Sequence, residues 1–163
     1  MRLTMCALVL AAAVGAAACK QGDGPLPEKS GDVPNRLGDL HRDLQAIIGG
    51  DQRAIQDLSD DLLVFTEEPE AQTAARAMAV TVCSLLVNRP LNDETQTRII
   101  DLMWKAVAAR ELSERQVDAL KDDVRNTLLG IGVTQPDANL AAGRVADVQK
   151  AVTLRERRWY ERY

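Results

Sequence analysis

Apolar residues recur three or four positions apart from residue 37 almost to the end of the chain. This spacing lines up side chains on one face of an α-helix, whereas a half-buried strand requires strict alternation. Glycine and proline interrupt the pattern at intervals that suit six short helices. Residues 37–163 are therefore predicted to form an all-α domain, a compact bundle of about six short helices.

Several predicted helices begin with a polar residue that can cap the first turn. Ser113 with Gln116 has the spacing of a capping box, and Thr134 with Asp137 begins the last helix in the same manner. The other candidate caps are Asn35 for the first helix, Asp51 for the second, and Asn92 or Asp93 for the fourth.

The predicted third helix, residues 69–88, is the most apolar of the six. Between residues 71 and 87 it carries a single charged side chain, that of Arg76. Its predicted buried arc covers about two-thirds of the circumference and contains Ala74, Met78, Val80, Val82, Cys83 and Leu86. We expect such a helix to be surrounded by others and to form the structural centre.

The first 18 residues have the pattern of an export signal. Arg2 supplies a positive charge, residues 5–18 are uncharged and largely apolar, and small residues precede Cys19. The apolar run has about 14 residues, fewer than the roughly 20 that a membrane-spanning helix needs. We therefore expect cleavage of this segment rather than a permanent span.

The junction Ala16-Ala17-Ala18-Cys19 resembles the lipobox of bacterial lipoproteins, with Ala16 in place of the usual leucine. The resemblance covers residues 1–19 and implies a signal peptide over residues 1–18, with acyl chains such as palmitate on Cys19. Several chains anchor a protein stably, whereas one binds only reversibly. By comparison with such proteins of enteric bacteria, Lys20 implies the outer membrane, with the protein facing the periplasm. Ordinary secretion, with cleavage near Ala18 and a free Cys19 thiol, is the alternative.

Residues 19–36 are predicted to form a flexible tether. They combine glycines, prolines and scattered charges, a composition that cannot bury a core. As a flexible coil, this segment would hold the domain on the order of 23 Å from the membrane. The net charge is −4 for the full chain and −5 once Arg2 is removed. This mild acidity, together with export, argues against nucleic acid as a partner.

The candidate catalytic and metal-binding residues have simpler structural explanations. Cys83 has no disulfide partner in the mature chain, and a small buried side chain is favoured over a nucleophile. His41 has no second histidine with which to form a metal site. Residues 57–68 carry acids at several positions of a calcium loop, but Leu62 stands where that loop needs glycine, so a helix is favoured. We predict no cofactor, no metal site and no catalytic residue.

The last ten residues, LRERRWYERY, gather three of the five aromatic residues and four arginines. Trp, Tyr and Arg dominate protein interfaces, and the candidate partner-binding residues are accordingly Arg155, Arg158, Trp159, Tyr160 and Tyr163. There are two alternatives. In the first, Trp159 and Tyr163, which are one helical turn apart, pack onto the bundle. In the second, the segment contacts a membrane or a glycan.

Three functions fit these features. The first is a non-enzymatic, lipid-anchored accessory protein of the cell envelope that binds another envelope protein through a helical surface, similar in class to helical secretin pilotins or scaffold proteins. The second is an immunity or inhibitor lipoprotein against a toxin that acts on the envelope. The third is a small cell-wall hydrolase, which would require two acids such as Asp57 and Glu67 to meet in a cleft with shifted pKa values.

Overall fold

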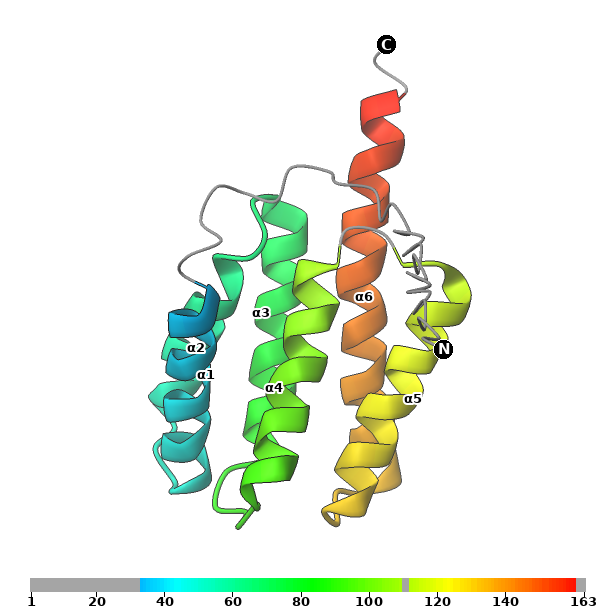
Figure 1. Cartoon of the computed structure of the whole chain (residues 1–163). Helices are drawn as coiled ribbons and strands as arrows, with labels where there is room; N and C mark the ends of the chain where they lie inside the picture. Colours follow the sequence, from blue (N-terminus) through cyan, green and yellow to red (C-terminus); the bar gives the residue numbers. More distant parts are fainter. Residues whose placement is uncertain (1–32, 110–111, 161–163) are drawn as a thin grey trace, which may run out of the picture. The chain divides into compact units, whose positions relative to one another are not determined.

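The structure is a computed structural model that describes residues 33–109 and 112–160, with the backbone alone for residues 33, 34 and 153–160. Within this part, the chain forms helices and no strand (Figure 1). The helices are α1 (Val33–Ile48), α2 (Ala54–Leu63), α3 (Pro69–Ser84), α4 (Asp93–Ala108), α5 (Glu114–Gly130) and α6 (Gln135–Tyr160). The predicted all-α bundle of six helices is confirmed. None of these helices is long and apolar enough to cross a membrane.

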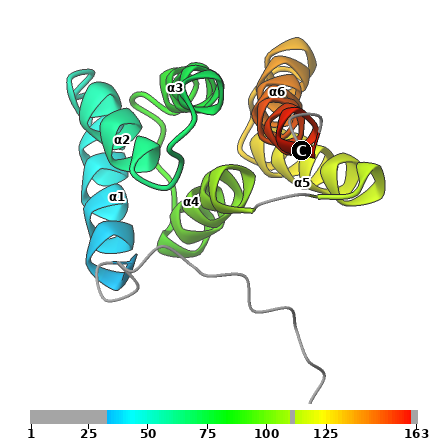
Figure 2. The ribbon, with the colours of Figure 1, turned by 90° about the horizontal axis from the view of Figure 1, so that it is seen from above.

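The helix at the centre of the bundle is α4, which packs against each of the other five helices. Seen along the helix axes, α1, α2, α3, α6 and α5 follow one another around α4, and the ring is open between α5 and α1 (Figure 2). The prediction that the third helix is the structural centre is therefore wrong. α3 belongs to the surrounding ring and packs against α2, α4 and α6.

The difference between α3 and α4 lies in the size and spread of their buried side chains. α4 buries seven residues, five of them large and apolar: Gln96, Ile99, Ile100, Leu102, Met103, Ala106 and Val107. Half of the six buried residues of α3 are alanines, and Val80, predicted to be buried, is 41% exposed. The low number of charged residues in α3 suggested a central position. Alanine-rich helices, however, can lie at a surface as well as in a core.

The predicted caps of the later helices are confirmed. The Asn92 side chain accepts a hydrogen bond from Thr95 N–H at 2.8 Å, and Ser113 forms the capping box that starts α5. Thr134 Oγ1 accepts from Asp137 N–H at 3.4 Å at the start of α6. These motifs lie within a few residues of sequence, so local chemistry suffices to predict them.

Other predicted boundaries shift in the structure. α1 begins at Val33, so Asn35 lies inside the helix rather than capping it, because Pro34 is well tolerated in a first turn. The Asp51 side chain accepts from Arg53 N–H at 2.9 Å, just before α2. α3 ends at Ser84 instead of reaching residue 88, and a turn follows in which Asn88 adopts a positive φ of 58°.

Successive helices run in alternating directions, so the start of α1 and the end of α6 lie at the same end of the bundle (Figure 1). We call this the termini end. At the opposite end, Gly50 has a φ of 99°, and a Cβ there would lie 2.6 Å from Asn88 Oδ1. Arg89 donates from Nε to the Leu85 carbonyl at 2.7 Å and from Nη1 to the Ile131 carbonyl at 3.2 Å. The α3–α4 connection thus contacts the turns of both neighbouring hairpins.

Candidate interaction surface at one end of the bundle

The four aromatic residues in the described part of the chain belong to segments at the termini end. Phe65 lies in the loop after α2, Trp104 lies in the last two turns of α4, and Trp159 and Tyr160 end α6. The rings of Phe65 and Trp104 meet edge to face, with their centroids 6.4 Å apart. Val64, beside Phe65, is 44% exposed. Aromatic residues that are far apart in sequence therefore gather at one end of the fold.

At this end α6 extends past its neighbours. Its 26 residues exceed the 17 of α5, its antiparallel partner, by nine, which corresponds to about 14 Å of helix. In Figure 1 the last turns of α6, drawn in red, stand beyond the ends of the other helices. The helical backbone of residues 153–160 thus projects from the bundle.

The predicted partner-binding residues fall on this projection or just after it. Arg155, Arg158, Trp159 and Tyr160 belong to the last turns of α6, whose side chains lie outside the described part of the structure. Tyr163 and the predicted lipidation site, Cys19, are themselves outside the described residues. The fold therefore brings four of the five candidate residues to the termini end.

Cys83 is a buried free thiol on α3. Burial raises the pKa of this thiol to about 12, and the nearby negative charge of Asp43 adds to the effect. A thiol that stays protonated is a poor nucleophile, and the predicted role as a small buried side chain is consistent with this environment.

The other two candidate sites lack the arrangement that their chemistry requires. His41 is half-buried on α1, and no group of three or more candidate ligands gathers to hold a metal ion within the described residues. Residues 57–63 of the candidate calcium loop belong to α2, which continues through Leu62 and ends at Leu63. The helical alternative is thus correct for this part, whereas residues 64–68 leave the helix earlier than predicted. Asp57 lies in the first turn of α2, and Glu67 follows the end of that helix. The two acids are thus at opposite ends of α2 and do not share a cleft.

Acidic residues do gather where α1 packs against α2. Burial raises the pKa of Asp43, and the negative charge of Asp61 raises it further. Burial likewise raises the pKa of Asp61, with a second contribution from the charge of Asp39. Arg42, on α1, partly offsets both shifts. The cluster is a source of repulsion between two packed helices.

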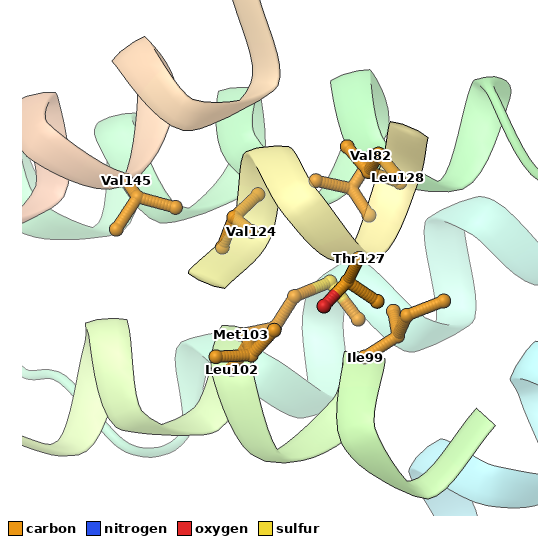
Figure 3. Close-up of a pocket in the computed structure, with 8 residues that line it drawn as sticks. All are labelled: Val82, Ile99, Leu102, Met103, Val124, Thr127, Leu128 and Val145. Atoms are coloured by element: carbon orange, nitrogen blue, oxygen red, sulfur yellow. The ribbon is translucent and has the colours of Figure 1, made fainter. Parts of the chain in front are cut away.

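A small cavity lies between α3, α4, α5 and α6 (Figure 3). Its lining is apolar apart from Thr127, whose hydroxyl donates to the Asp123 carbonyl at 2.7 Å. The free volume is about 10 Å³, at the lower limit of the roughly 10–15 Å³ that one water molecule requires. The space is a packing gap and is too small for a substrate.

Besides Val64, sequence reasoning missed two exposed aliphatic side chains, which lie on helices. Leu140 on α6 is 52% exposed, and Val80 on α3 is 41% exposed. α3 packs directly against α6, so these two exposed side chains belong to neighbouring helices. The only sequence signal was that Leu140 falls outside the Val145 and Val148 stripe that is buried in α6.

Comparisons with protein-family models, with curated proteins and with solved structures found no match to this chain.

Proposed function

We propose that this chain is a lipid-anchored accessory protein of a bacterial cell envelope, attached through Cys19, that binds another envelope protein through the surface of its helical bundle. The single observation that supports a binding surface is the exposure of Val80 and Leu140 on two helices that pack against each other. Exposed aliphatic side chains on a charged domain gain free energy when a partner covers them.

The position of the start of α1 supports the proposed attachment to the membrane through Cys19. Residues 1–32 precede α1 at the termini end, so an anchor at Cys19 keeps this end nearer the membrane. The outer sides of α3 and α6 run along the length of the bundle and are accessible to a second protein.

Site-specific photo-crosslinking in native membranes tests the partner. A photoreactive amino acid at position 80 or 140 should yield an adduct with the same envelope protein from both positions. Position 45, where the exposed Gln45 lies on α1, is the matched control. No shared adduct, or an equal adduct from position 45, would contradict the proposal.

The anchor has its own test. Cys19→Ser removes the acceptor of the lipid and should release the protein from the membrane fraction into the soluble envelope fraction. A Cys6→Ser variant, altered within the predicted signal peptide, should remain attached. Attachment of the Cys19→Ser chain equal to that of the unaltered protein would refute lipidation at this residue.

A further inference from the structure

The projecting end of α6 carries positive charge on an acidic protein. Residues 153–160 contain three arginines and one glutamate, a net charge of +2, whereas the whole chain has a net charge of −4. The same segment contains Trp159 and Tyr160. Arginine is attracted to anionic lipid surfaces, and Trp and Tyr are enriched at the level of the headgroups.

The last turns of α6 share the termini end with the start of α1, which follows the predicted anchor residue Cys19 in the sequence. An even number of alternating helices brings the end of α6 to the same end of the bundle as the start of α1 (Figure 1). The last turns of α6 stand beyond the start of α1 at this end (Figure 1). The end of α6 can therefore face a bilayer on the side of the bundle from which the chain toward Cys19 leaves.

The acidic residues at the start of α3 limit contact with an anionic membrane to the projecting end of α6. Glu67, Glu68 and Glu70 also belong to the termini end and would be repelled by anionic lipid. The last turns of α6 stand beyond the start of α3 as well (Figure 1), and electrostatic interactions are screened over about 8 Å at physiological salt. The last turns of α6 can thus reach the headgroups before these acids do.

We propose that the last turns of α6 bind the surface of a bilayer that contains anionic phospholipid, so that the bundle stands with its termini end on the membrane. The proposal takes its orientation from the anchoring at Cys19 in the proposed function. An unlipidated chain tests it separately, so the two proposals can fail independently.

Co-sedimentation with vesicles measures this contact. The chain from residue 19 onward, with Cys19→Ser, should bind vesicles of equal parts phosphatidylcholine and phosphatidylglycerol, and bind phosphatidylcholine vesicles far more weakly. Arg155→Gln with Arg158→Gln should reduce the partition coefficient by about fivefold for each arginine and about thirtyfold together. Arg98→Gln with Arg125→Gln removes the same charge from exposed ion pairs on α4 and α5 and should leave binding unchanged.

Tryptophan fluorescence tests whether Trp159 lies at the vesicle surface. Trp104→Phe leaves Trp159 as the sole tryptophan, and its emission should shift to shorter wavelength with the anionic vesicles and not with the neutral ones. Circular dichroism of each variant checks that the bundle remains folded. Equal binding to both vesicle types, equal loss in the control variant, or an unchanged Trp159 emission would overturn the proposal. A crosslink from position 160 to an envelope protein, without vesicle binding, would assign this end to a protein partner instead.

Discussion

Gln149 connects α6 to the end of the central helix. It is 2% exposed, and its Nε2 donates to the Ala106 carbonyl at 2.7 Å and to the Ala109 carbonyl at 3.4 Å. The last carbonyls of a helix have no partner within the helix. One side chain of α6 thus pairs a buried and a half-buried carbonyl at the end of α4, the helix that contacts all the others.

Replacing Gln149 by methionine removes the donor while keeping an unbranched side chain of similar size. A buried acceptor that loses its partner costs about 1–3 kcal/mol, and methionine fills irregular space with little strain. We expect the free energy of unfolding to fall by about 2 kcal/mol. For a domain of this size, that lowers Tm by roughly 6–10 °C.

Thermal and urea unfolding followed by far-UV circular dichroism measure the change. Gln135→Met, at an exposed position in the first turn of the same helix, is the matched control and should stay within about 0.5 kcal/mol of the parent. Hydrogen exchange should also become faster at the amides of the last turn of α4. If Gln149→Met is as stable as this control, the two hydrogen bonds do not secure α4 and the reasoning fails.

Three further outcomes are expected. Ser59 is fully buried and its Oγ has no hydrogen-bond partner in the described part of the structure, so Ser59→Ala should leave stability unchanged or raise it by about 1 kcal/mol in urea unfolding; a clear loss would show that the hydroxyl is bonded. Burial and the charge of Asp39 raise the pKa of Asp61 above its ordinary 3.8, so ionised Asp61 destabilises the fold at neutral pH and this cost is relieved as pH falls. Asp61→Asn should therefore raise Tm at pH 7, with a gain that shrinks toward pH 4; a gain independent of pH would contradict the assignment. The Cys83 thiol, with a pKa of about 12, should react with thiol reagents only when the chain unfolds, and rapid labelling of the native protein would refute its burial.

The features predicted correctly from the sequence are those set by neighbours along the chain. Asn92, Ser113 and Thr134 act as caps because each bonds a backbone group only a few residues away. The number of helices follows from the Gly and Pro punctuation in the same way. These capping hydrogen bonds depend on neighbouring residues in the sequence and not on how the helices pack.

The features that sequence reasoning missed depend on how the helices pack. Val80 shares an apolar arc with Met78 and Val82, yet α3 turns it outward because only three helices surround that helix. The position of α4 at the centre follows from contacts with segments throughout the chain. Burial of the acids between α1 and α2, which raises the pKa of Asp43, likewise appears only once the two helices are paired.

The even number of helices determines at which end of the bundle a fused reporter domain would lie. With six alternating helices, a reporter domain fused behind Tyr163 would be attached on the side of the proposed membrane contact. It would be crowded against the lipid and would hold the α6 projection away from it. The turn between α5 and α6 lies at the opposite end of the bundle, away from the proposed contact. A label meant to leave the membrane contact intact would therefore belong at that end rather than behind Tyr163.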